Sequence, residues 1–196
     1  MNEQNKLLRR SAIARILADR GDTLVVTGLG SPTYDCAAVG DHPLNFYLWG
    51  AMGSAVTVGL GLALAQPKRR VFVVTGDGEM LMGLGALATV AAKKPTNLAI
   101  TVVDNERYGE TGMKPTHTSA GVDLAGIART CGFCQTATVR QMRELDAAVA
   151  MLHTADGPAL VVLKVSAARD PLVLPSWDGA LLKSRFRQAL LGRQAA

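Results

Sequence analysis

Two side chains in the middle of the chain, Asp77 and Asn105, have the types and spacing needed to hold a metal ion beside a phosphate. Asp77 lies between two glycines directly after an apolar, β-rich run at residues 71–75, and Asn105 closely follows a second apolar run at 98–103. The segment between them, 80–92, is apolar and interrupted by glycines rather than charges, which indicates a helix buried on most sides. This order predicts a strand–turn–helix–strand unit with both polar residues at the carboxyl ends of strands, where open parallel sheets bind ligands.

The oxygen atoms of this pair suit a hard divalent cation. The carboxylate of Asp77, the amide oxygen of Asn105 and carbonyls in the following loop match Mg²⁺, which prefers oxygen ligands and often shares them with substrate phosphates. The amides of Gly78, Glu79 and Met80 open the expected helix, and such a helix start binds phosphate through free N–H groups and the positive dipole end. An aspartate between glycines is also common in ordinary turns, so the prediction depends on its pairing with Asn105.

Several short sequence motifs carry a resemblance to a known family. They are Asn45-Phe46-Tyr47, Gly50-Ala51-Met52-Gly53, Gly76-Asp77-Gly78-Glu79, Asp104-Asn105-Glu106 and Thr111-Gly112 followed by Pro115-Thr116. With these motifs, over nearly its whole length, the chain resembles the diphosphate-binding domain of thiamine diphosphate (ThDP) enzymes. Within that family it looks most like the β subunit of sulfopyruvate decarboxylases and the corresponding half of phosphonopyruvate decarboxylases. The likeness implies ThDP and Mg²⁺ as cofactors and is less specific for the substrate.

The resemblance also implies roles for individual residues. The Mg²⁺ ligands would be the side chains of Asp77 and Asn105 and the backbone oxygen of Arg107. Met52 would wedge between the two rings of the cofactor, and the carbonyl of Gly50 would accept a hydrogen bond from its aminopyrimidine. The implied cofactor contacts are Gly50, Met52, Gly76, Asp77, Gly78, Glu79, Met80, Asn105, Arg107, Tyr108 and Gly109.

ThDP catalysis also needs a glutamate that protonates the pyrimidine ring nitrogen. In the family this residue belongs to a second domain, for which 196 residues leave no room. Glu79 and Glu110 are not candidates, because both are expected at the diphosphate end, where Glu79 must point away from the diphosphate, for instance towards solvent. The resemblance therefore implies a separate α subunit that carries the pyrimidine-binding domain, in an α₂β₂ or larger assembly.

The reaction implied by the resemblance is loss of CO₂ from a 2-oxo acid to give an aldehyde. Carboligation by a synthase is the close competitor, because it uses the same cofactor chemistry. Lys114 and His117, the candidate catalytic residues of this chain, follow Asn105 in the loop expected to close over the cofactor, and Lys114 could pair with an anionic group at C3 of the substrate, such as a sulfonate. A solvated lysine on a turn is the alternative interpretation.

The rest of the chain alternates expected strands and helices. We expect an amphipathic first helix within residues 1–20, a strand at 23–27, a short helix and loop at 31–49 and an apolar helix at 54–65. A loop at 108–113, helices at 123–130, 141–152 and 181–191, and strands at 136–139 and 159–165 follow the central unit. This pattern predicts an α/β fold in which the whole chain, 1–196, forms one doubly wound parallel sheet of five or six strands with helices on both faces.

Composition and smaller motifs bear on other classes of protein. The net charge of +5 comes from scattered basic residues with few aromatics, which does not favour nucleic-acid binding. No apolar run reaches the ~20 residues that span a bilayer, so a cytoplasmic protein is expected. The pair Cys131 and Cys134 lacks a second pair of zinc ligands and is interpreted as a helix end with Gly132 as the C-cap. A non-catalytic nucleotide-binding protein is the alternative from another class, although the glycines after the first expected strand do not complete G-x-G-x-x-G.

Overall fold

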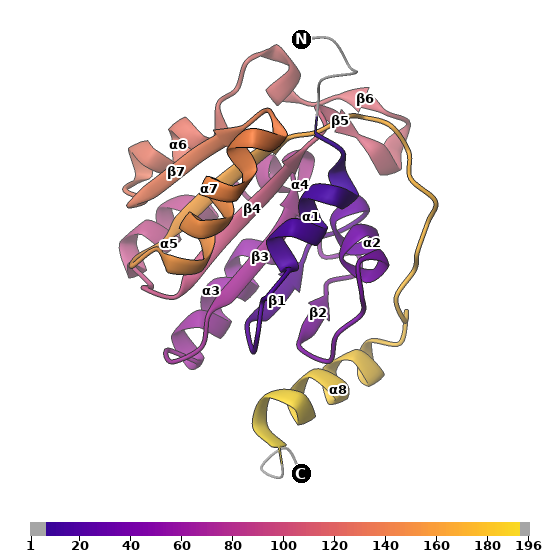
Figure 1. Ribbon diagram of the computed structural model, residues 1–196, viewed down its shortest axis with the longest axis vertical. Coiled ribbons are helices and arrows are strands. Elements are labelled where there is room, and N and C mark those ends of the chain that lie inside the picture. Colours follow the sequence, from indigo (N-terminus) through magenta and orange to yellow (C-terminus); the bar gives the residue numbers. More distant parts are fainter. Residues whose placement is uncertain (1–6, 193–196) are drawn as a thin grey trace.

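The computed structural model describes residues 7–192 and is built around one twisted, fully parallel sheet (Figure 1). Its six strands lie in the order β2-β1-β3-β4-β8-β7. Their bounds are β1 Leu24–Thr27, β2 Asn45–Tyr47, β3 Val71–Gly76, β4 Leu98–Asp104, β7 Gln135–Val139 and β8 Ala159–Lys164. The chain leaves β1 towards β2 on one side and returns to β3 on the other side. The carboxyl ends of β1 and β3 therefore flank the switch point at which open α/β sheets bind ligands.

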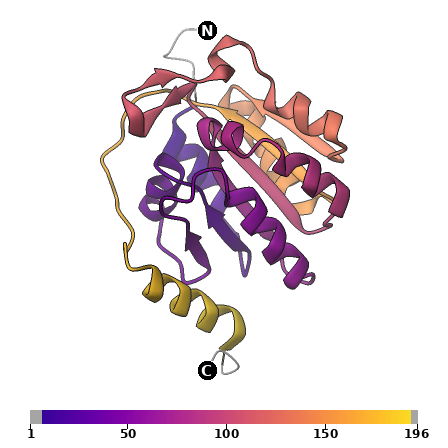
Figure 2. The same cartoon turned by 180° about the vertical axis from the view of Figure 1, so that it is seen from behind.

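Both faces of the sheet are covered by helices, as Figures 1 and 2 show from opposite sides. One face carries α1 Arg9–Leu17, α2 Ser31–Ala38 and α7 Met142–Thr154, and the other carries α3 Ala55–Ala65, α4 Asp77–Met82, α5 Ala86–Lys93 and α6 Leu124–Cys131. Successive strand residues point to opposite faces. Phe72 and Val74 accordingly join one hydrophobic cluster, whereas Val71 and Val73 join the other.

Two further segments complete the described chain. An antiparallel pair, β5 Arg107–Tyr108 and β6 Lys114–Pro115, encloses the 3-10 turn η2 Gly109–Thr111 and is followed by η3 His117–Ala120. After β8 an extended strap, residues 166–178, runs along the side of the molecule to α8 Gly179–Leu191, where Phe186 packs on Phe46 of the edge strand β2 at a ring distance of 5.5 Å (Figure 1). Among residues 7–192, no helix is both long and apolar enough to cross a membrane.

The fold class expected from the sequence is confirmed, and most expected elements lie within a few residues of the observed ones. The prediction of a single helix at 80–92 is wrong, because the chain forms two helices, α4 and α5, separated by Gly83-Leu84-Gly85. A Cβ at Gly83 would lie 2.2 Å from the carbonyl oxygen of Gly53. Close backbone contact with the Gly53 turn therefore interrupts the helix at this point.

Three smaller expectations also differ from the structure. The segment 31–49 contains the short strand β2, which has only three residues and showed no periodicity. Leu7 pairs with Val165 in an isolated bridge instead of joining the first helix, and Leu8 is exposed, while the part of that expected helix before Leu7 lies outside the described residues. The loop expected at 108–113 is mostly the η2 turn of the β5–β6 pair. The helix end at Cys131 is confirmed, with Gly132 in the left-handed region at φ +110°.

Candidate functional site

A cavity lies at the carboxyl ends of β1, β3 and β4, at the switch point of the sheet. Its wall is formed by the turn at 76–79, the loop at 29–32, Asn105, the segment 107–111, Met52 and Arg9. Apart from Gly50 and Met80, every residue expected to contact the cofactor lines this cavity. Gly50 lies outside the lining in the left-handed region at φ +72°. The Met80 side chain is buried in the core, so the predicted contact of Met80 would be made by its backbone amide.

Asp77 occupies the first turn of α4 and is only 2% exposed. Its Oδ2 accepts a hydrogen bond from the hydroxyl of Thr116 at 2.5 Å, and the hydroxyl oxygen of Thr118 lies 3.4 Å away. Burial raises the pKa of Asp77 to about 6, with the charge of Asp104 adding to the shift and the Thr116 hydroxyl opposing it. A dication at this position would favour the ionised carboxylate, since an opposite charge stabilises it.

Asn105 lies on a tight turn directly after β4. Its Oδ1 accepts a hydrogen bond from the amide of Arg107 at 2.9 Å, and the preceding Asp104 accepts one from the amide of Glu106 at 3.0 Å. Glu106 adopts the left-handed region at φ +62°, an unfavourable conformation for a residue with a side chain. The turn is thus held by hydrogen bonds that place Asn105 in the wall of the same cavity as Asp77, and its amide oxygen has a second lone pair available.

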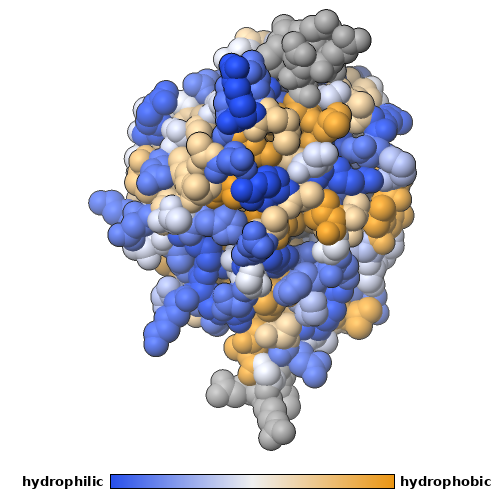
Figure 3. Space-filling view, in the orientation of Figure 1, coloured by the Kyte–Doolittle hydropathy of each residue, from blue (hydrophilic) through white to orange (hydrophobic). Residues whose placement is uncertain are grey.

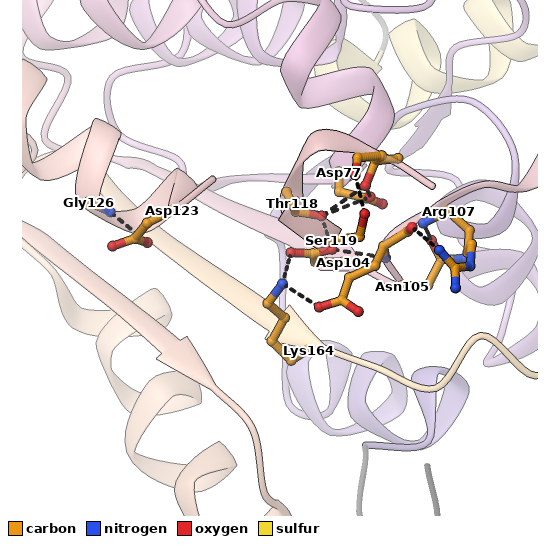
Figure 4. A network of polar contacts seen from close by, with 11 residues as sticks. Asp77, Asp104, Asn105, Arg107, Thr118, Ser119, Asp123, Gly126 and Lys164 are labelled. Carbon is orange, nitrogen blue, oxygen red and sulfur yellow. Dashed lines mark hydrogen bonds and ion pairs between the residues drawn. The ribbon is translucent and has the colours of Figure 1, made fainter. Parts of the chain in front are cut away.

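A network of polar contacts surrounds Asp77 and the turn that carries Asn105, as Figure 4 shows. Thr118 bridges the two strand ends, because its hydroxyl donates to Asp104 at 2.8 Å and also lies beside Asp77. Lys164, the last residue of β8, pairs with Asp104 at 2.7 Å and with Glu106 at 3.0 Å. Thr118 and Lys164 could not be recognised from the sequence, because neither residue lies in a motif of its own and the contacts of both depend on strand order.

Glu79 is buried, contrary to the suggestion that its carboxylate turns back towards solvent. It is 4% exposed, and its Oε2 accepts a hydrogen bond from the amide of Leu29 at 2.9 Å. A Cβ at Gly28 would lie 1.6 Å from that oxygen, so the β1 loop needs glycine there. Burial raises the pKa of Glu79, and nearby hydrogen-bond donors, which include the backbone amide of Leu29, partly offset this effect. Glu79 therefore ties α4 to the loop after β1.

Gly78 and Met52 lie where a ligand would meet the cavity wall. A Cβ at Gly78 would lie 2.6 Å from the ring of Tyr108 and 3.8 Å from the methyl group of Met52. Only glycine lets the Tyr108 ring approach the turn this closely. The hairpin therefore covers the start of α4, and Met52 borders the same space.

The predicted substrate contacts lie further out. Lys114 and His117 are both exposed, and neither lines the cavity. Glu110 does line it, and burial raises the pKa of the nearby Tyr34, with the negative charge of Glu110 adding to the shift. Arg9, which the sequence analysis did not single out, also reaches the wall and pairs with the buried Asp35.

The residues present fit a dication and a diphosphate. Asp77 and Asn105 supply hard oxygen atoms, and the first turn of α4 supplies amides that a helix start offers to phosphate. The fold and the site thus define an α/β domain that holds a phosphate-bearing ligand and a divalent metal at the carboxyl edge of its sheet.

Comparison with known proteins gives the family. Residues 29–163 match the family model described as "Thiamine pyrophosphate enzyme, C-terminal TPP binding domain", and the chain belongs to this family. ThDP with a divalent metal, usually Mg²⁺, is therefore the cofactor of this domain. The chain is 37% identical to the sulfopyruvate decarboxylase subunit beta of Methanothermobacter thermautotrophicus, covering 95% of this chain and 97% of that protein.

Other relatives are longer than this chain. It is 41% identical to the phosphonopyruvate decarboxylase of Streptomyces viridochromogenes over 91% of its own length but only 45% of the relative's. A solved structure described as that of "a putative thiamin diphosphate-dependent enzyme isolated from Mycobacterium smegmatis" matches with a TM-score of 0.71 and 25% identity over 83% of this chain and 32% of that one. This chain therefore corresponds to less than half of these larger proteins and to nearly all of the smaller β subunit.

Proposed function

We propose that this chain, 1–196, is the diphosphate- and metal-binding β subunit of a two-chain ThDP-dependent decarboxylase. Its substrate would be a 2-oxo acid with an anionic group at C3, of the sulfopyruvate kind, and its products CO₂ and an aldehyde. The observation that carries the proposal is the end-to-end match to a sulfopyruvate decarboxylase β subunit, combined with a cavity that contains the matching polar residues.

The residues of this chain would bind and orient the cofactor. Asp77 and Asn105, with the backbone oxygen of Arg107, would hold Mg²⁺, and the amides at the start of α4 would hold the diphosphate. Met52 would support the bent arrangement of the two rings, and the Gly50 carbonyl would accept a hydrogen bond from the aminopyrimidine. Bound ThDP supplies the electron sink that lets a 2-oxo acid lose CO₂. The hairpin at 107–115 would exclude water from the reacting end.

The glutamate that serves the pyrimidine ring would come from a partner chain. Three carboxylates line the cavity within the described residues, and each has another position or role: Asp77 in the metal site, Glu79 against Leu29, and Glu110 at the rim beside Tyr34. A partner with a pyrimidine-binding domain would close the open side, in an α₂β₂ or larger assembly.

The decisive experiment is an assay of the chain co-expressed with its partner. A panel of 2-oxo acids, including sulfopyruvate, phosphonopyruvate, oxaloacetate and pyruvate, would be tested with and without an acceptor aldehyde. Aldehyde and CO₂ as the main products, with preference for an anionic C3 group, are expected. Efficient acyloin formation would instead identify a carboligase. Nucleotide in the purified complex in place of ThDP would favour the alternative of a non-catalytic nucleotide-binding protein.

A further inference from the structure

Lys164 is a largely buried cation whose position the binding of ThDP does not by itself explain. It ends β8, beside β4, and its side chain is 11% exposed. Its ammonium lies 2.7 Å from Oδ2 of Asp104 and 3.0 Å from Oε1 of Glu106. Burial lowers the pKa of Lys164, but the two carboxylates more than offset this effect and keep the ammonium charged.

The two carboxylates that Lys164 pairs with flank Asn105 in the sequence. Asp104 is 1% exposed, so its charge needs a partner inside the protein. Glu106 holds the left-handed backbone conformation of the turn, which persists only where neighbouring contacts fix it. Lys164 therefore anchors the residue before Asn105 and the residue after it at one point (Figure 4).

The same network reaches Asp77. Asp104 accepts the hydroxyl proton of Thr118 at 2.8 Å, and the hydroxyls of Thr118 and Thr116 lie 2.9 Å apart. Thr116 in turn donates to Asp77 at 2.5 Å. A chain of direct contacts thus connects Lys164 to the side chain of Asp77, and Asn105 lies in the sequence between the two residues that Lys164 holds.

We propose that Lys164 is a positioning residue of the metal site: its ammonium clamps Asp104 and Glu106 on either side of Asn105 and so fixes the turn that presents the Asn105 oxygen to the dication. The inference rests on the proposed roles of Asp77 and Asn105. Outer partners of this kind orient metal ligands, and their loss commonly weakens metal binding by about 10- to 100-fold.

Whether loss of the Lys164 ammonium weakens or tightens Mg²⁺ binding distinguishes a positioning role from a purely electrostatic one. Removing a cation near a dication should tighten metal binding if only long-range electrostatics mattered. Loss of the clamp should weaken it, because Asp104 and Glu106 would repel each other and the turn would lose its fixed geometry. Lys164→Met removes the charge while keeping a long apolar stem, and Lys164→Arg keeps the charge.

The test is calorimetric titration of Mg²⁺ into the purified two-chain complex saturated with ThDP, together with kcat as a function of Mg²⁺ concentration. Lys164→Met should weaken Mg²⁺ binding about tenfold or more, with kcat largely restored at saturating Mg²⁺, and Lys164→Arg should recover most of the affinity. Arg140→Met is the matched control, because Arg140 is an exposed cation lining the same hollow as Lys164 and should leave Mg²⁺ affinity unchanged.

Two more variants make every outcome decisive. If Lys164→Met does not fold, Lys164→Gln, which removes the same charge and keeps a polar side chain, should weaken Mg²⁺ binding in the same direction, and unchanged or tighter affinity would overturn the proposal. Unchanged or tighter binding in Lys164→Met, with Asp77→Ala abolishing Mg²⁺ binding, would reject the role of Lys164 alone. Full Mg²⁺ binding by Asp77→Ala would reject the proposed metal site and this inference with it.

Discussion

The floor and the rim of the cavity are built in opposite ways. The floor is the buried polar network at the start of α4 and the end of β4: Asp77, which lines the cavity, and Asp104, which lies behind it, are 2% and 1% exposed and have several polar partners each. The rim is the surface just outside the lining residues: there Lys114 and His117 are exposed, and the strap at 166–178 carries Leu172 at 69% exposure. The floor is therefore complete within this chain, whereas the rim has the open character of a surface that a second chain would cover.

The strap adds to this contrast. Its large apolar residues, together with the first turn of α8, reach the surface at Leu172, Val173, Leu174, Trp177 and Leu181. Figure 3 shows apolar side chains at the surface along the side where the strap runs in Figure 1. Contiguous exposed apolar side chains often mark a protein interface. The contrast between floor and rim can be tested in three ways: by omitting the partner chain, by substituting residues of the floor, and by substituting residues of the rim.

The largest effect is expected from removing the partner chain. This chain alone should show no decarboxylation of any 2-oxo acid, because the proposed pyrimidine-binding glutamate lies elsewhere. Adding the partner should restore turnover, which a CO₂-release assay with each chain purified separately would measure. Robust turnover by this chain alone, with mass spectrometry showing no co-purified protein, would contradict the proposal.

The next largest effect is expected on the floor. Asp77→Ala in the complex removes the buried carboxylate proposed to bind the metal, and since loss of outer partners already costs about 10- to 100-fold, kcat/KM should fall by at least about 100-fold. Calorimetry should show a parallel loss of Mg²⁺ and ThDP binding. Asp146→Ala, at a carboxylate that is 76% exposed and pairs with Arg15, is the control and should keep both affinities. Unchanged cofactor affinity in Asp77→Ala would show that Asp77 does not bind the metal.

A smaller effect is expected where the floor meets the loop after β1. Gly28→Ala would place a Cβ 1.6 Å from Oε2 of Glu79 and force this buried carboxylate out of its contact with Leu29. Such overpacking should lower the free energy of unfolding by about 1–3 kcal/mol. Urea denaturation of the complex would measure it.

The matched control for that change is Gly61→Ala in α3. A Cβ at Gly61 would meet no atom within 4 Å, and alanine in a helix interior should raise stability by about 0.5–1 kcal/mol. If Gly28→Ala shifts the urea midpoint in the same direction and by the same amount as Gly61→Ala, the buried position of the Glu79 carboxylate does not require the space beside Gly28.

The same contrast explains how far the sequence could predict the structure. Asp77 and Asn105 were predictable because each follows an apolar strand directly, so a local pattern places it at the sheet edge. Lys164 and Thr118 were not, because their contacts exist only when β8 lies next to β4 and the chain after the hairpin folds back over Asp77.

Short elements and backbone contacts also escaped the sequence. The strand β2 has three residues, too few to show a period, and it is recognised only by its pairing with β1. The interruption of the helix expected at 80–92 depends on contact between Gly83 and Gly53, thirty positions earlier. The alternation of strands and helices predicted the parallel sheet, whereas contacts between distant segments required the structure.

The smallest effect is expected on the rim, at Lys114. The resemblance suggests that its ammonium pairs with the anionic group of the substrate, but in this chain the side chain is exposed and opposes Tyr108 on the hairpin. An exposed ion pair is worth at most about 1 kcal/mol, so Lys114→Met should lower kcat/KM for sulfopyruvate by about fivefold or less. Activity on pyruvate should stay nearly unchanged, because pyruvate has no anionic group at C3.

The comparison of the two substrates decides what Lys114 does. A loss confined to the anionic substrate, and shrinking at high salt, would place Lys114 beside the substrate's C3 group, because salt screens exposed charge pairs. A loss of tenfold or more would mean that the partner buries Lys114, since burial strengthens a charge-assisted contact to about 1.5–3 kcal/mol. Equal losses of kcat/KM on both substrates would mean that the substitution disturbs the hairpin. No loss on either substrate would mean that Lys114 is solvated and does not contact the substrate. His117→Gln, at the other exposed position of the rim, is the companion variant and should change neither substrate's kcat/KM more than about twofold, since a surface substitution usually shifts a free energy by less than about 0.5 kcal/mol.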